Sequence, residues 1–266
     1  VTVTPIHVDI FAADKMSIDG SSVAGGKTEV MKTVENENLY AWYGDLQIGE
    51  LQVPVEFDGM NYYLVPADGS SDIHDGQPID VKMQETPVSW NIPAAGNYRL
   101  LVDMENKQVR FYSEATDLQP KSVTFRPNGA ETNPETTIVV TDLWAYGGGT
   151  GWSARQLNLK QSMADPQILI YDASEHDGAK LSGSMKFCVA KSFSVDGTSY
   201  SQDNAYCFTN PLTADGKQQN LSLALGKEGE LHGSADRETR NSYYKIPAAD
   251  LLIIDLRHMT ILARNK

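Results

Sequence analysis

The feature that most constrains the fold of this chain is an internal repeat. Four short patterns occur twice, in the same order, along the 266 residues. The clearest is an Ile-Pro-Ala-Ala string at 92–95 and again at 246–249, followed each time by two strand-like segments. The other three patterns pair residues 49–55 with 183–189, 57–59 with 195–197, and 67–69 with 214–216. Such self-similarity predicts that one structural module is present twice.

Both copies have the residue pattern of short β-strands. Apolar and polar residues alternate over 98–102 and 108–112, and the residues between them suit a turn. Asp58-Gly59 and Asp196-Gly197 are dipeptides favoured in tight hairpins, because glycine accepts a positive φ. Neither half contains a convincing amphipathic helix. We therefore expect an all-β chain of two tandem β-sandwiches that are immunoglobulin-like or carbohydrate-binding-module-like.

The boundary between the copies is expected near residues 116–121. These residues lack strand periodicity, and their proline and small polar side chains suit an exposed linker. Module 1 then comprises residues 1–115 and module 2 residues 122–266. Each is long enough to bury a core of its own.

Composition and motifs argue against several classes of function. A net charge of −13 repels phosphate backbones, so we expect no nucleic-acid partner. Signatures of hydrolases, phosphate-binding loops, dinucleotide folds and metal sites are missing from the sequence, so no enzyme, cofactor or metal is expected. The sequence leaves one enzymatic alternative open, a glycosidase-like pair among the many carboxylates. Asp103 and Asp255 match between the copies, but both are expected to stabilise hairpin turns. The run 147–151 is read as a flexible surface loop, and 68–76 as a solvated loop rather than a calcium site.

The chain has two cysteines, Cys188 and Cys207, on segments rich in apolar residues. They could face each other across a sheet and form a disulfide in an oxidising compartment. Two buried free thiols are the alternative.

The aromatic residues are the informative feature. A strand with two adjacent aromatics places one ring on each face, so at least one ring of each pair can reach solvent. Exposed rings flanked by polar side chains are what a sugar-binding face needs, whereas the alternative is that they belong to the cores. Trp90 is expected in a core. The candidate ligand-binding residues are Trp144, Tyr146, Trp152, Trp42, Tyr43 and Tyr62.

Several motifs together suggest a family. The segment 138–140 with Thr150-Gly151-Trp152 resembles the opening strand and loop of a known type of β-sandwich module, and residues 181–187 and 48–53 resemble its central strand. The segment 95–104 resembles its closing strand. This layout resembles the SusE/SusF-like surface glycan-binding lipoproteins of Bacteroidetes. The opening loop of the first copy has no Gly-Trp, and the second copy has Asp250-Leu251-Leu252 in its closing strand.

The resemblance implies non-catalytic binding of a polysaccharide or oligosaccharide by aromatic platforms on sandwich loops. It also implies an outer-membrane lipoprotein of a polysaccharide-utilization system. A signal peptide and a lipidated cysteine would then lie upstream of Val1, and other outer-membrane glycan-uptake proteins would be partners. The alternative is a structural or adhesive surface protein, or a spacer module, without sugar binding.

Overall fold

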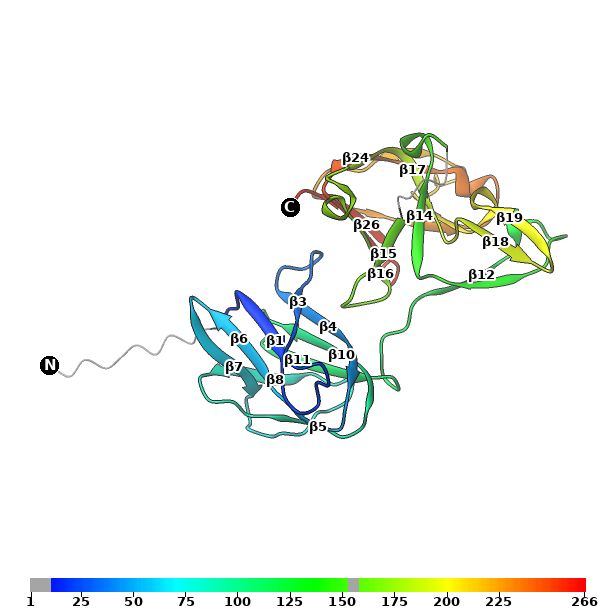
Figure 1. Cartoon of the computed structure of the whole chain (residues 1–266). Helices are drawn as coiled ribbons and strands as arrows, with labels where there is room; N and C mark the ends of the chain where they lie inside the picture. Colours follow the sequence, from blue (N-terminus) through cyan, green and yellow to red (C-terminus); the bar gives the residue numbers. More distant parts are fainter. Residues whose placement is uncertain (1–10, 153–157) are drawn as a thin grey trace. The chain divides into compact units, whose positions relative to one another are not determined.

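The computed structural model describes residues 11–152 and 158–266. Internal contacts divide the chain into two compact units, with the boundary along the chain between Leu118 and Gln119. The all-β prediction is confirmed: in the described residues the regular elements are strands and short 3-10 turns. In each unit the sheet curls into a sandwich-like or barrel-like layer around its own core (Figure 1).

The first unit is built on a sheet whose pairings run round in a ring. Its strands are β1 (Lys15–Ile18), β2 (Thr28–Glu29), β3 (Met31–Lys32), β4 (Leu39–Leu46), β5 (Gly49–Leu51), β6 (Val53–Phe57), β7 (Met60–Pro66), β8 (Ile79–Gln84), β9 (Trp90–Ile92), β10 (Gly96–Asp103) and β11 (Gln108–Ser113). The order of pairing is β2-β1-β6-β7-β8-β11-β10-β4-β3. Only Val30 separates β2 from β3, so the two ends of this order meet.

The second unit has a similar ring of paired strands, with longer segments connecting them. Its strands are β12 (Ser122–Phe125), β13 (Thr136–Val139), β14 (Asp142–Tyr146), β15 (Asn158–Gln161), β16 (Ile168–Asp172), β17 (Leu181–Cys188), β18 (Ser192–Val195), β19 (Thr198–Ser201), β20 (Cys207–Thr209), β21 (Asn220–Ser222), β22 (Glu228–Glu230), β23 (His232–Ser234), β24 (Tyr243–Ala249), β25 (Leu251–Asp255) and β26 (Thr260–Arg264). The 3-10 turns are η1 (Pro127–Gly129), η2 (Gly148–Thr150), η3 (Ala173–His176), η4 (Gln202–Asn204) and η5 (Thr239–Asn241). One side of the ring runs β14-β15-β16-β25-β26-β22 and the other β14-β17-β20-β23. Leu231 alone separates β22 from β23, so this ring also closes.

The two units pair their Ile-Pro strands in the same register. In the first unit, β5 and β9 place Gly49 opposite Ile92 and Leu51 opposite Trp90. In the second unit, β17 and β24 place Gly183 opposite Ile246 and Met185 opposite Tyr244. In these two strand pairs, the residues that match in sequence therefore occupy matching positions.

The turn predictions are confirmed. Asp58-Gly59 has φ values of 49° and 71°, and Asp196-Gly197 has 48° and 78°, as tight two-residue hairpins require. In the closing hairpins the backbone N–H of Asn106 donates to the Asp103 carboxylate, and Asp255 accepts likewise from His258. Both aspartates are thus turn residues, which is the role predicted for them.

Each unit buries a separate core. In the first unit, Trp90 is completely buried and its ring centroid lies 5.2 Å from that of Phe111, which confirms its predicted place in the core. In the second unit, Tyr171, Phe187 and Phe208 are among the large side chains with no more than 1% exposure. Burial of such side chains is the main favourable term in folding each unit.

The residues expected as an exposed linker include one that is firmly held. The guanidinium of Arg99 forms two hydrogen bonds to the Asp117 carboxylate, at 2.7 and 3.1 Å. Both side chains are largely buried, at 8% and 14% exposure. Asp117 therefore belongs to the body of the first unit.

Replacing Asp255 by asparagine should reduce the pH dependence of the second unit's stability. His258 Nδ1 lies 2.7 Å from Asp255 Oδ2, and this hydrogen bond and charge raise the pKa of His258 above 6.5. A raised folded-state pKa stabilises the fold below the ordinary pKa, and this contribution is lost as pH rises through the raised value. Wild-type thermal stability should thus fall on raising pH through this range, and less so in D255N.

The repeat supplies a matched control for this experiment. D103N alters the equivalent turn in the first unit, where residues 103–107 contain no histidine. Its melting temperature should follow the wild-type pH profile across the same range. Identical pH profiles for D255N and wild type would contradict the assignment.

Candidate functional site

A glycine-rich loop after β14 forms the base of the candidate site in the second unit. The backbone N–H groups of Thr150 and Trp152 both donate to the Gly147 carbonyl, at 3.1 and 2.9 Å. A Cβ at Gly149 would collide with the carbonyl oxygen of Ser182 in strand β17. The loop is therefore packed closely on β17, although Gly148, Gly149 and Gly151 are exposed at the surface as expected.

Trp152 is the most exposed aromatic residue that this loop presents. Its side chain is 58% exposed, and its backbone has φ = 55°. A positive φ is unusual for a bulky residue and marks a position that the surrounding structure enforces. Its ring packs edge-to-face with Tyr146 at 5.9 Å and with Tyr243 at 5.6 Å. Residues from a loop, β14 and β24 thus make one aromatic surface, which we call the aromatic triad.

Lys186 of β17 lies beneath this triad. Its ammonium Nζ is 5.6 Å from the ring centroids of both Tyr146 and Tyr243. The same atom lies 3.0 Å from Asp203 Oδ1 and 2.8 Å from Asn241 Oδ1, and the side chain is fully buried. These contacts fix a cation between two aromatic faces and two side-chain oxygens.

The charge of Lys186 is maintained despite its burial. Burial alone lowers the pKa of a lysine, because it penalises the charged form. Here the neighbouring thiols, the Tyr243 phenol and the Asp203 carboxylate outweigh burial and raise the pKa of Lys186 above its ordinary value. The ammonium is therefore charged at neutral pH and holds its oxygen partners in place.

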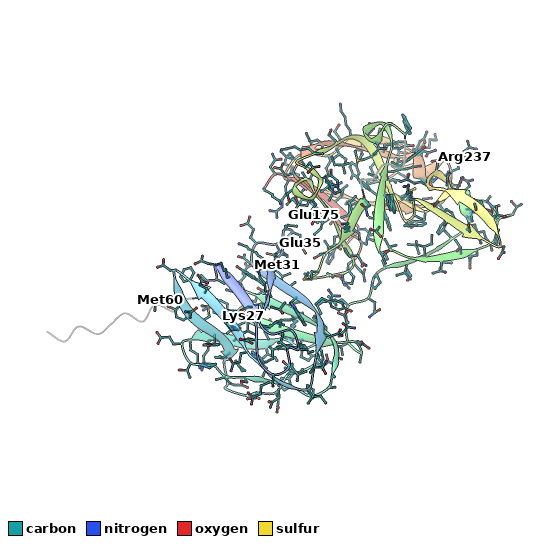
Figure 2. The ribbon with its side chains drawn as sticks, viewed as in Figure 1. Lys27, Met31, Glu35, Met60, Glu175 and Arg237 are labelled. Atoms are coloured by element: carbon teal, nitrogen blue, oxygen red, sulfur yellow. The ribbon has the colours of Figure 1, made fainter. Side chains whose placement is uncertain are left out.

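A hollow of about 760 Å³ adjoins the aromatic triad through Asn241. The hydroxyl of Tyr243 is 3.3 Å from Asn241 Oδ1, and Asn241 Nδ2 donates to the carbonyl of Arg237 at 2.9 Å. Arg237 is labelled in Figure 2. The hollow is lined by Gly216, Lys217, Gln218, Arg237, Glu238, Thr239 and Asn241. It presents both donors and acceptors of hydrogen bonds beside the rings.

The other residue predicted in the second unit lies beside the triad. Trp144 alternates with Tyr146 along β14, so the two share a face of the sheet and are both half-buried. The ammonium of Lys191 lies 5.7 Å from the Trp144 ring. The Trp144 carbonyl accepts a hydrogen bond from Gln202 at 3.1 Å. Of the second unit's candidates, Tyr146 and Trp152 are in ring contact, and Trp144 follows on the same strand face.

The predicted residues of the first unit form no such group. Trp42 is only 9% exposed and belongs to the core, so its ring is not offered to a ligand. Tyr43, on the opposite face of β4, is 47% exposed, and the guanidinium of Arg99 covers its ring at 4.8 Å. Tyr62 is half-buried and packs against the core. Adjacent residues on one strand face opposite ways, which accounts for the contrast between Trp42 and Tyr43.

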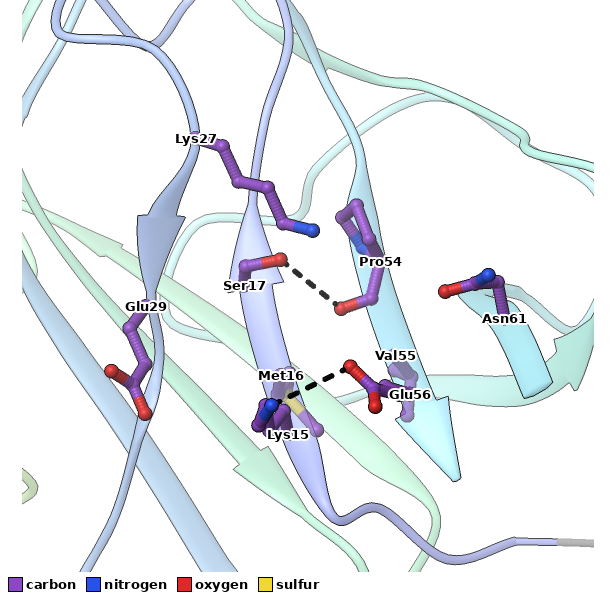
Figure 3. Close-up of a pocket in the computed structure, with 9 residues that line it drawn as sticks. All are labelled: Lys15, Met16, Ser17, Lys27, Glu29, Pro54, Val55, Glu56 and Asn61. Carbon is purple, nitrogen blue, oxygen red and sulfur yellow. Dashed lines mark hydrogen bonds and ion pairs between the residues drawn. The ribbon is translucent and has the colours of Figure 1, made fainter. Parts of the chain in front are cut away.

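The first unit has a polar pocket of about 340 Å³ between β1, β2, β6 and β7 (Figure 3). Lys15 and Glu56 form an exposed ion pair at 3.8 Å, and the Ser17 hydroxyl donates to the Pro54 carbonyl at 3.5 Å. Its lining residues are Lys15, Met16, Ser17, Lys27, Glu29, Pro54, Val55, Glu56 and Asn61. Its charges are of both signs and no aromatic ring lines it, so the second unit offers the stronger site.

Sequence reasoning missed four contributors to this site. Tyr243 is not among the candidates that the sequence supplies, and Asp203 and Asn241 belong to no motif. Lys186 lies within the repeated segment 183–189, but nothing there marks it as a site residue. One signal was present: Lys186 lies between Met185 and Phe187, so a half-buried strand would turn it away from their core. The partners of Lys186 on that other face are Asp203 and Asn241, which lie 17 and 55 positions further along the chain.

Comparison with protein-family models gives no match to this chain, and comparison with curated proteins gives none either. In residues 11–152 and 158–266, no three or more His, Cys, Asp or Glu side chains group in a way that could hold a metal ion. No helix in that same part of the chain is long and apolar enough to span a membrane. The site is therefore interpreted from its own geometry.

Replacing Gly149 by alanine should destabilise the second unit by about 1–3 kcal/mol, because the added methyl group overpacks the contact with Ser182. Gly148 is the matched control: a Cβ there meets only Ser184 at ordinary distances of 3.9 and 4.0 Å. G148A should change the free energy of unfolding by less than about 0.5 kcal/mol. Chemical denaturation of both variants checks this, and equal stability of G149A and G148A would refute close packing of the loop.

Proposed function

We propose that the second unit binds carbohydrate without catalysis, on the aromatic triad of Tyr146, Trp152 and Tyr243. The observation that carries this proposal is the exposed Trp152 ring, fixed edge-to-face against two tyrosines. A ring held on two sides loses little conformational freedom when a ligand binds, and this lowers the cost of binding.

The chemistry of the triad suits a sugar. A pyranose has an apolar face of C–H groups that packs on an aromatic ring, and hydroxyl groups around its edge that need hydrogen-bond partners. Beside the triad, Asn241, Gln218 and Thr239 provide uncharged polar groups, and Lys217 and Arg237 provide cationic donors. Together these resemble the usual composition of a ligand site, with apolar walls and a few polar groups.

The role of Asp203 in this proposal is to position other groups. Its side chain is 51% exposed, and its carboxylate is paired with the buried Lys186 ammonium. A carboxylate held this way fixes Lys186, and through it the tyrosine rings that support Trp152. The proposal therefore assigns Asp203 to the framework of the site and requires no acid–base step.

The wider assignment is also a proposal. A protein with this binding surface fits the SusE/SusF-like surface lipoproteins, with a glycan as ligand and other outer-membrane glycan-uptake proteins as partners. Both units have the same pairing of their Ile-Pro strands, as tandem copies of one module would. The net charge of −13 favours a neutral glycan over a polymer of uronic acids.

The test is a glycan array of neutral and uronic-acid polysaccharides, followed by calorimetry on any hit. Trp152→Ala should weaken binding roughly tenfold or more, because a central tryptophan usually dominates such a contact. Its melting temperature should stay close to that of wild type, because the ring is 58% exposed.

Tyr43→Ala is the matched control, since it removes an aromatic ring of 47% exposure from the first unit. It should leave affinity for the same glycan unchanged. Binding that is lost in Y43A and kept in W152A would place the site in the first unit. An array without any hit would contradict the proposal and favour a structural or spacer role.

A further inference from the structure

The two cysteines of the second unit lie directly opposite each other on neighbouring strands. Cys188 of β17 pairs with Cys207 of β20, and their sulfur atoms are 2.8 Å apart as free thiols. At the next pair, the Val189 N–H donates to the Tyr206 carbonyl at 3.0 Å. The cysteines therefore occupy a non-hydrogen-bonded pair, where Cα atoms are about 4.5 Å apart and the side chains are closest.

This geometry suits a covalent bond between them. Disulfides join residues whose Cα atoms are about 4.4–6.8 Å apart, so no movement of the backbone is needed here. We propose that Cys188 and Cys207 form a disulfide by exchange with a low-molecular-weight disulfide, and that Cys207 is the attacking thiol. This inference does not depend on the proposed glycan site.

The surroundings of the pair distinguish the two sulfur atoms. Two buried cations lie nearby: Lys186 is fully buried, and Arg240 is 1% exposed. Arg240 lies on the Cys207 side of the pair, because Cys207 pairs with Ser234 of β23 and the Arg240 guanidinium bonds to the next residue, Ala235. The Arg240 guanidinium donates to the carbonyl oxygens of Ala235 and Asp203, at 2.8 and 2.5 Å, which are uncharged acceptors. Its positive charge therefore adds to that of Lys186 in favouring a thiolate.

The two thiols respond differently to this environment. Burial raises the pKa of Cys207, but the hydrogen bond from Cys188 and the charges of Lys186 and Arg240 outweigh it, so its pKa lies below the ordinary value. For Cys188, burial and the interaction with Cys207 raise the pKa well above that value. Cys207 is thus the better nucleophile, and Cys188 is the resolving thiol.

The reaction proceeds in two exchange steps. The Cys207 thiolate attacks one sulfur of the small disulfide, forming a mixed disulfide and releasing one small thiolate. Cys188 then loses its proton and attacks Cys207 Sγ, which forms the protein disulfide and releases the second small thiol. Two protein thiols are oxidised and one small disulfide is reduced to two thiols. Because both cysteines are fully buried, exchange in the folded unit proceeds through local opening.

The disulfide would join the two ends of the segment 188–207, which supports the aromatic triad. Cys188 and Cys207 are 19 positions apart, and the segment between them contains the hairpin β18–β19 and Asp203 of η4. A disulfide at the base of such a loop restricts the unfolded chain and stabilises the folded one. We expect the oxidised second unit to melt about 5–10 °C higher than the reduced one.

The test uses the full chain, refolded in defined mixtures of oxidised and reduced glutathione. After denaturation, free thiols are alkylated and the intact mass is measured. The chain contains only two cysteines, so the number of labels reports the pair directly. We expect two labels under reducing conditions, none under oxidising conditions, and a peptide that links Cys188 to Cys207. Two labels under every condition, or glutathione retained on both cysteines, would overturn the proposal.

Single substitutions test the assignment of roles. Cys188→Ser should trap a stable glutathione adduct on Cys207, whereas Cys207→Ser should react several-fold more slowly. Equal or reversed rates would overturn the role of Cys207 as attacking thiol. If either variant fails to fold, the order of attack is read from the wild type, by stopping the exchange early with acid and locating the glutathione by peptide mapping.

Discussion

The second unit depends on the alternation of side chains along strand β17. Met185 and Phe187 point into the core, while Lys186 and Cys188 point to the other face, which is also buried. The same strand pairs with β24 through its first half and with β14 and β20 through its second half. Core packing, the aromatic triad and the cysteine pair therefore all depend on one register. A slip of one residue would exchange the two faces and lose all three.

Burial of the Lys186 ammonium is the most costly feature of this arrangement. Removing a charge from water costs several kcal/mol unless partners replace the lost hydration. Here Asp203 and Asn241 accept its hydrogen bonds, and the rings of Tyr146 and Tyr243 lie close by, each with its centroid 5.6 Å from the ammonium. The fold should tolerate replacement of Lys186 by an apolar residue of similar size. An apolar residue could not hold Asp203 and Asn241 beside Tyr243. The charge of Lys186 therefore contributes more to positioning these surface side chains than to the stability of the fold.

The parts of the fold that sequence predicted are those with local causes. Asp-Gly turns, Asp103 and Asp255 at hairpin entries, and the Ile-Pro strands act through neighbouring residues, so their patterns can be read directly. The aromatic residues were only partly predictable, because Trp42 and Tyr43 differ by one position and lie on opposite faces of β4. The partners of Lys186 were not predictable. Asp203 and Asn241 come from two separate segments between strands of the sheet, and the residues around each give no sign that it contacts Lys186.

The longer segments between the strands of the second unit also explain why the two units, whose strands pair in similar closed rings, have different surfaces. In the first unit the outer face of β1 and β6 is left as a polar pocket, where Ser17 bonds to Pro54. In the second unit the corresponding strands, β14 and β17, place Trp144 opposite Cys188. Both residues are at least half-buried there, and Gln202 of the 189–206 excursion bonds to Trp144. The ring of paired strands fixes the position of each face of the sheet. The length of the loops decides whether that face is open, covered or bordered by aromatic residues. Divergence between the units is therefore concentrated in segments that the ring itself does not constrain, which is where a binding surface can change at the least cost to folding.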